Sequence, residues 1–146
     1  MSKRILIVDD EADINTALRE LLEQNGFSVD SFENSRHALE NFKPHYYDLL
    51  ILDIKMPEMS GFSFYREIKK LDGKMKVCIL TAAEIIYGEY SDILSSLPDV
   101  CIIHKPVTNE RSIKNYKKSI VLCLSSFQKS ERLVCFVLCF VDTAIK

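Results

Sequence analysis

The stretch "ILIVDDEAD", Ile5–Asp13, places four aliphatic residues directly before a segment with four carboxylates in five positions. The aliphatic run predicts a buried strand, whereas the adjacent Asp9 and Asp10 need water or a counter-charge. Such a change is expected where a strand leaves the core and reaches the surface. The stretch therefore indicates a strand that carries acidic side chains at its carboxyl end.

The rest of the chain repeats one pattern, a short apolar run followed by a segment with helical periodicity. In the first helical segment apolar residues recur at i, i+3, i+4, i+7 and i+8 from Ile14 to Leu22, and Gly26 follows as a stop signal. Weaker versions of this helical pattern follow each later run. The five expected strands are Ile5–Val8, Phe27–Phe32, Leu49–Leu52, Val77–Leu80 and Val100–Ile103.

Continuous aliphatic strands are typical of a parallel sheet that helices cover on both faces. Right-handed crossovers then limit the topology. We therefore predict an α/β fold with a single doubly wound (βα)5 sheet. Ligands bind outside the carboxyl ends of the strands in such sheets, and the residues expected at that edge are Asp9, Asp10, Asp53, Thr81, Lys105 and Pro106.

The residue types at this edge suit phosphoryl chemistry. Clustered carboxylates repel one another and raise the pKa of at least one member unless a cation offsets them. Mg²⁺ favours one or two direct carboxylates, retained waters and a substrate phosphate. A hydroxyl from Thr81 and an ammonium from Lys105 would complete a phosphoryl site. Together these groups indicate phosphoryl transfer to an aspartate.

Four motifs in this order resemble the receiver domain of two-component response regulators, over about Lys3 to about Leu124. The resemblance implies a flavodoxin-like topology with strand order 2-1-3-4-5, a receiver domain over residues 1–125 and a C-terminal extension over 126–146. Each motif alone is weakly specific, but all four at these spacings are highly specific. They are "ILIVDDE" at 5–11, "LLILDIKMPEMSGF" at 49–62, "CILTA" at 78–82 and "HKP" at 104–106.

The resemblance implies a phosphoryl acceptor and a metal site. Asp53 would accept a phosphoryl group from a phosphohistidine on a sensor histidine kinase or phosphotransfer protein. Mg²⁺ would be held by Asp10, Asp53 and the backbone carbonyl of Lys55, with Asp9 acting through a bound water. Pro57 and Gly61 would shape a turn into the next helix.

The resemblance also implies contacts to the phosphoryl group and a switch. Thr81 and the backbone N–H of Ala82 would bind the phosphoryl oxygens, Lys105 would bridge to them, and the bond before Pro106 would be cis. The family commonly has an aromatic residue three positions before the lysine, where it moves inward on activation together with the threonine. Here that position is Ile102. Output would then come from movement of the segment after Thr81 or from an unusual partner.

Length and composition limit the class of protein to which the chain can belong. The 146 residues fit one domain, and 47% hydrophobic with 27% charged residues is typical of a soluble globular protein. The apolar run Ile5–Val8 is shorter than the core of a signal peptide, about 7–15 residues, so we expect a cytoplasmic protein. Five cysteines without a CxxC pair favour neither a disulfide framework nor a zinc site.

The charge distribution and the tail limit the classes of partner that we expect the chain to bind. Residues 1–113 carry 13 basic and 19 acidic side chains, which argues against direct nucleic-acid binding. The tail is too short for a DNA-binding module with its own core. Its apolar run Leu133–Val141 is also shorter than the roughly 20 residues of a membrane span. We interpret the tail as a packed chain end, with homodimerisation or partner docking as the alternative hypothesis.

These observations favour a stand-alone receiver whose output is a downstream protein partner, and not an enzyme beyond the chemistry of its own aspartyl phosphate. A receiver-like interaction module that is never phosphorylated is the alternative. A phosphatase with a DxD nucleophile motif is disfavoured because Lys55 occupies the position of the second aspartate. No GxGxxG follows the first strand, which excludes a dinucleotide-binding enzyme.

Overall fold

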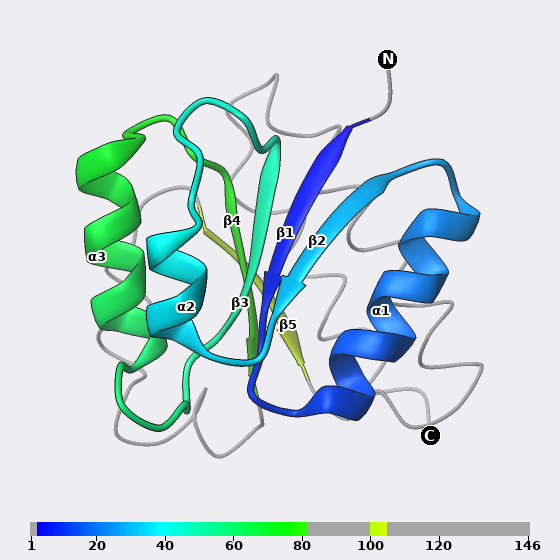
Figure 1. Ribbon diagram of the computed structural model, residues 1–146, viewed down its shortest axis with the longest axis horizontal. Helices are drawn as coiled ribbons and strands as arrows, with labels where there is room; N and C mark the ends of the chain where they lie inside the picture. The colour runs from blue at the N-terminus through cyan, green and yellow to red at the C-terminus, as the bar shows by residue number, and fades with distance from the viewer. Residues whose placement is uncertain (1–2, 82–99, 105–146) are drawn as a thin grey trace.

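The computed structural model describes residues 3–81 and 100–104, which form a five-stranded parallel sheet with helices (Figure 1). The order of the strands is β2-β1-β3-β4-β5, as predicted. The strands are β1 Arg4–Val8, β2 Ser28–Phe32, β3 Leu49–Asp53, β4 Val77–Thr81 and β5 Val100–His104, and the helices are α1 Ala12–Gln24, α2 Ser35–Glu40 and α3 Gly61–Leu71.

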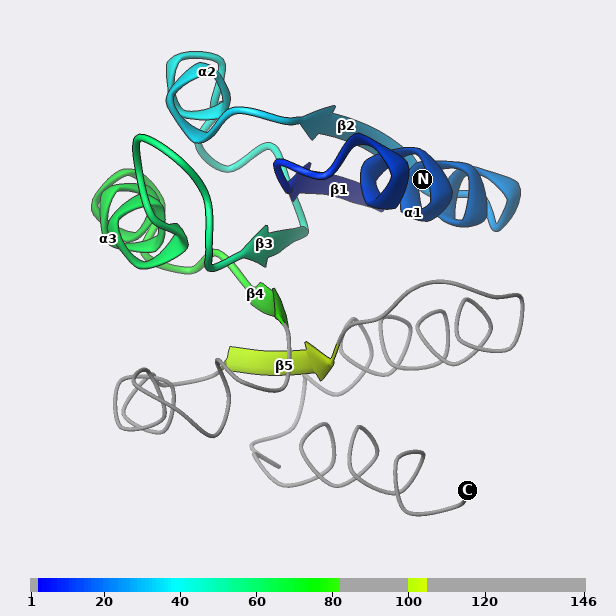
Figure 2. The same ribbon diagram turned by 90° about the horizontal axis from the view of Figure 1, so that it is seen from below.

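The helices cover both faces of the sheet, with α1 on one face and α2 and α3 on the other (Figure 2). Side chains alternate between the two faces of a strand. Ile5 and Ile7 of β1 therefore pack in one core cluster with Leu18 of α1, whereas Leu6 and Val8 pack in a second cluster with residues of α2 and α3. Burial on both faces explains why Ile5–Val8 and Leu49–Leu52 are aliphatic without interruption.

Helix α1 matches the predicted periodicity. Its buried apolar residues are Ile14, Leu18 and Leu22. The helix ends at Gln24, with Asn25 as C-cap and Gly26 in a left-handed conformation at φ 86°. That conformation is the reason a glycine follows the helix, because a Cβ would be strained there. In the described part of the chain, no helix is long and apolar enough to cross a bilayer.

Helix α2 is shorter than the apolar pattern suggested. It begins after Asn34, whose side chain accepts a hydrogen bond from the His37 N–H at 3.0 Å, and it ends before Asn41. Phe42, which the pattern placed on the helix, follows it and still packs against the core. The fourth and fifth predicted helices, and the domain boundary at residue 125, lie outside the described residues.

Helix α3 begins in direct contact with the end of β3. The Gly61 N–H donates to the Ile54 carbonyl at 2.8 Å, and Ser60 caps the helix. A Cβ on Gly61 would overlap the Asp53 carbonyl oxygen and lie 2.7 Å from the Ile54 Cα. The left-handed residue of this loop is Glu58, with φ 67°. Gly61 is therefore required for close backbone approach, and not for the turn geometry that the sequence suggested.

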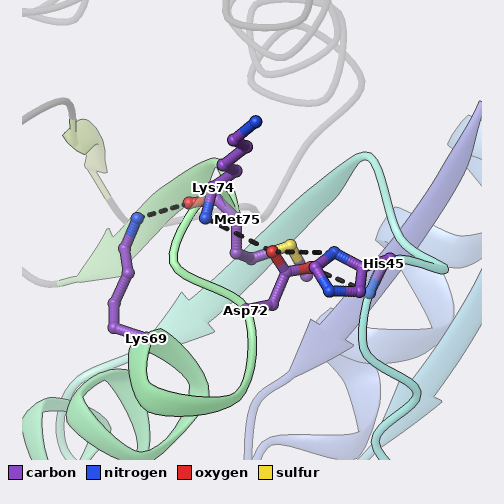
Figure 3. Close-up of polar contacts among 5 residues, drawn as sticks. All are labelled: His45, Lys69, Asp72, Lys74 and Met75. Carbon is purple, nitrogen blue, oxygen red and sulfur yellow. Dashed lines mark hydrogen bonds and ion pairs between the residues drawn. The ribbon is translucent and has the colours of Figure 1, made fainter.

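At the amino ends of the strands, a buried aspartate links two loops (Figure 3). Asp72 is 5% exposed and accepts hydrogen bonds from the backbone N–H of His45 at 3.0 Å and of Lys74 at 3.3 Å. Lys69 Nζ donates to the Met75 carbonyl at 2.6 Å. These contacts fasten the loop before β3 to the loop before β4, so the amino ends of both strands are held in place.

A tyrosine ties β2 to the start of β3 nearby. The Tyr47 hydroxyl donates to the Asp30 carboxylate at 2.7 Å. Burial raises the pKa of Tyr47, and the hydrogen bond and charge of Asp30 raise it further. The hydroxyl therefore remains a protonated donor across the physiological range of pH.

We expect Ile68→Ala to lower the free energy of unfolding by about 2–5 kcal/mol, because Ile68 is fully buried against the sheet and its loss leaves a cavity. The matched control is Leu71→Ala on the same helix. Leu71 is 48% exposed, so this change should stay within about 0.5 kcal/mol. Urea denaturation measures both, and equal effects would contradict the described packing of α3.

We expect Gly61→Ala to lower the free energy of unfolding by about 1–3 kcal/mol, because the new methyl group must push α3 away from the Asp53 backbone. Gly73→Ala is the control, since its Cβ would meet only the Lys69 carbonyl oxygen at 3.7 Å, and it should be neutral or stabilising by up to about 1 kcal/mol. Thermal and urea unfolding compare the two variants. A Gly61→Ala variant as stable as wild type would refute the close approach.

Candidate functional site

Three carboxylates meet at the carboxyl edge of the sheet. Strands β1 and β3 are parallel neighbours with Val8 opposite Leu52, so Asp9 after β1 and Asp53 at the end of β3 lie side by side. One carboxylate oxygen from each of Asp9, Asp10 and Asp53 lies within 4.8 Å of the other two. The structure thus brings together the three acids that the sequence analysis assigned to a metal.

Because two of these acids are buried, placing the carboxylates close together costs free energy. Asp9 is 1% exposed and Asp53 is 4% exposed, whereas Asp10 faces solvent. Two unit charges about 4 Å apart repel by about 4 kcal/mol at an effective dielectric constant near 20. Asp9 Oδ1 accepts a hydrogen bond from the Glu11 N–H at 2.9 Å, which holds this carboxylate in place. A cation at the edge would offset the remaining repulsion.

The donor set fits Mg²⁺. Mg²⁺ binds oxygen at about 2.0–2.1 Å, so two oxygens on the same ion are at most about 4.2 Å apart. Oxygens that lie within 4.8 Å of one another are therefore compatible with a shared Mg²⁺ ion. Lys55, whose carbonyl the family resemblance implicates, is two residues after Asp53 in the loop that leaves β3.

The remaining predicted residues divide into three groups. Thr81 ends β4, one residue beyond the Leu80 that pairs with Asp53, so its backbone reaches the same edge. Ile102 pairs with Ile79 in the sheet, is 8% exposed and belongs to the core cluster under α2 and α3. The last group, which lies outside the described residues, consists of Ala82, Lys105 and Pro106.

Asn15 is a residue of this region that the sequence analysis did not single out. It is 4% exposed on α1, and its Nδ2 donates to the Asp9 carbonyl at 2.6 Å. A signal was present, because Asn15 interrupts the apolar face of the helix one position after Ile14 and three before Leu18. Helical periodicity alone does not tell which backbone atom such a polar residue contacts.

The loop after Asp53 is held by the amino end of α2. Ser35 is 1% exposed, and its hydroxyl donates to the Met59 carbonyl at 3.0 Å. Asn34 Nδ2 donates to the Glu58 carboxylate at 3.3 Å. These contacts join residues 24 positions apart, so local sequence patterns do not reveal that the start of the helix holds the loop.

The comparisons with known proteins agree with this geometry. The model of the response regulator receiver domain matches residues 5–117. The chemotaxis protein CheY of Bacillus subtilis is 33% identical over 123 residues, which cover 82% of this chain and 99% of CheY. A CheY-like receiver domain protein from Methanospirillum hungatei JF-1 superimposes with a TM-score of 0.69 at 28% identity, covering 90% of this chain and 100% of that one.

A further solved structure, the response regulator TrrA from Thermotoga maritima in complex with Mg(2+)-BeF, is 37% identical with a TM-score of 0.61. It covers 80% of this chain and 97% of the TrrA chain. The family match extends over most of the sequence, and the described sheet has the topology that the resemblance implied. The chain therefore belongs to the family of response regulator receiver domains, the signalling domains of two-component systems.

Proposed function

We propose that this chain is a stand-alone receiver that is phosphorylated on Asp53 in a Mg²⁺-dependent reaction and then changes its contacts with a protein partner. The observation that carries the proposal is the carboxylate cluster, in which two buried acids and one exposed acid converge at the edge of the sheet. Similarity over 99% of the length of CheY supports a receiver function for this chain.

In the proposed reaction a sensor histidine kinase or phosphotransfer protein supplies the phosphoryl group as a phosphohistidine. An oxygen of Asp53 attacks the phosphorus, a P–O bond forms, and the P–N bond to the histidine breaks with its electron pair returning to the imidazole. Asp10, Asp53 and the Lys55 carbonyl would hold Mg²⁺ directly, and Asp9 would act through a water. Bound Mg²⁺ would supply positive charge that offsets the carboxylates and the phosphoryl oxygens.

The other assigned residues act on the phosphoryl group itself. The Thr81 hydroxyl and the Ala82 N–H donate hydrogen bonds to its oxygens, and Lys105 supplies positive charge to them. The cis bond before Pro106 shapes the segment that follows Lys105 in this proposal. The position of Thr81 at the carboxyl edge beside the end of β3 supports this assignment, as does TrrA, a relative solved in complex with Mg(2+)-BeF.

The proposed switch involves Thr81 and the segment that follows it. An exposed aromatic residue can move inward on activation, but Ile102 is already packed in the core at 8% exposure. Its burial supports output through movement of the segment that follows Thr81. The proposal includes a receiver domain over 1–125, an extension over 126–146 and a location in the cytoplasm. The family match covers residues 5–117 of the proposed domain.

We expect incubation with acetyl phosphate and Mg²⁺ to add the mass of one phosphoryl group to the chain, because the acidic cluster holds both the acceptor and the metal. Asp53→Asn should abolish the gain, and chelation of Mg²⁺ should suppress it in wild type. Asp13→Asn, an exposed acid in the first turn of α1, is the matched control and should retain the gain. Intact-mass spectrometry measures the mass gain in the wild-type chain with and without Mg²⁺ and in both variants. A mass gain that survives Asp53→Asn would contradict the assigned acceptor.

We expect Asp10→Asn to raise the melting temperature by about 2–4 °C when Mg²⁺ is absent, because it removes one of three mutually repelling charges. With Mg²⁺ the order should reverse, since only the wild-type cluster gains stability from the ion. Thermal unfolding followed by circular dichroism measures both conditions, with Asp13→Asn as the control. An unchanged or lower melting temperature without Mg²⁺ would show that Asp10 is not repelled by its neighbours.

A further inference from the structure

Asn15 is a buried amide at a position of α1 where packing against the sheet favours an apolar side chain. It lies on the helix face that presents Ile14, Leu18 and Leu22 to the sheet, and it is 4% exposed. Among the described residues its Oδ1 has no hydrogen-bond partner and no contact with solvent. A buried acceptor without a partner costs stability, so packing alone does not explain an asparagine at this position.

The amide nitrogen of Asn15 joins the ends of two strands. Nδ2 donates to the Asp9 carbonyl at 2.6 Å and to the Phe32 carbonyl at 3.3 Å, which uses both of its protons. The Asp9 N–H donates to the same Phe32 carbonyl at 3.1 Å. One side chain thus fastens the residue after β1 to the last residue of β2.

This contact acts on the peptide that links the first two acids of the cluster. The Asp9 carbonyl and the Asp10 N–H belong to one planar group, so fixing the carbonyl fixes the direction in which Asp10 leaves the strand. On the other side of this peptide the Glu11 N–H holds the Asp9 carboxylate at 2.9 Å. Asn15 and the Glu11 N–H therefore hold the Asp9–Asp10 segment from two sides.

We propose that Asn15 is a positioning residue of the metal site, which sets the direction of Asp9 and Asp10 toward Mg²⁺ through the Asp9 carbonyl. The inference rests on the proposed function, because it assumes that these acids bind the ion. Groups that orient metal ligands without touching the metal typically change its affinity by about 10–100-fold when they are removed. Asn15 has that relation to Asp9, since it contacts the backbone of the ligand and not its carboxylate.

The test is Asn15→Leu, which keeps the branching of the side chain, removes the unpaired oxygen and removes the donor. We expect the Mg²⁺ dissociation constant to rise at least about tenfold, while the melting temperature without Mg²⁺ stays within a few degrees of wild type. Affinity is read from amide chemical shifts during titration with MgCl₂ at constant ionic strength. Stability is read separately by circular dichroism.

Asn25→Leu, at the C-cap of the same helix, is the matched control. Asn25 Nδ2 also donates to a backbone carbonyl, that of Leu21 at 2.7 Å, but at the end of α1 away from the acids. Its Mg²⁺ dissociation constant should equal that of wild type. Asn15→Ala is the second variant, which removes the donor without introducing a larger side chain and should show the same loss of Mg²⁺ affinity.

The outcomes separate the inference from the function on which it rests. Wild-type Mg²⁺ affinity in a folded Asn15→Leu or Asn15→Ala variant would overturn the positioning role and leave the proposed function intact. Unfolding of both variants without Mg²⁺ would overturn it too, because Asn15 would then be a stability residue. A wild-type chain that does not respond to Mg²⁺ would instead refute the proposed function itself.

Discussion

The parallel pairing of β1 with β3 is the constraint on which the rest of the structure depends. Because Val8 lies opposite Leu52, the next residue of each strand is an aspartate at the same edge, and both carboxylates are nearly inaccessible to water. Bringing two buried carboxylates together costs free energy, and a cation or another positive group nearby would offset that cost. The aliphatic core that makes the pairing strong is thus also what places the two acids side by side.

A site built from mutually repelling carboxylates needs a rigid backbone frame around it. Here the frame consists of backbone carbonyls held by residues from three different elements. Gly61 lets α3 begin against the Asp53 backbone, Ser35 holds the Met59 carbonyl, and Asn15 holds the Asp9 carbonyl. Each contact reaches the chain within a few residues of an acid without touching its carboxylate. The same contacts link the site to α1, α2 and α3, which lie on both faces of the sheet (Figure 2).

Much of this arrangement could be predicted from the printed residues. The five short apolar runs and the periodicity from Ile14 to Leu22 predicted the strands and α1, and the family motifs predicted the order of the sheet. The boundaries were less exact, because a hydrogen-bond ladder continues past the last aliphatic residue and includes Asp53 and Thr81 in their strands. Phe42 was placed on a helix that ends earlier, since apolar contact with the core does not require helical backbone.

The sequence by itself determined the class of fold and the chemistry of the edge, because local hydrophobicity decides which segments are buried and the chain order decides which acids follow them. Only the tertiary structure decided that three carboxylate oxygens lie within 4.8 Å, that Gly61 is needed for contact rather than for a turn, and that Asn15 grips Asp9. These facts depend on which backbone atoms meet after folding. Residue types and their periodicity do not specify these contacts, since a polar side chain on a helix can reach any carbonyl that the sheet places beside it.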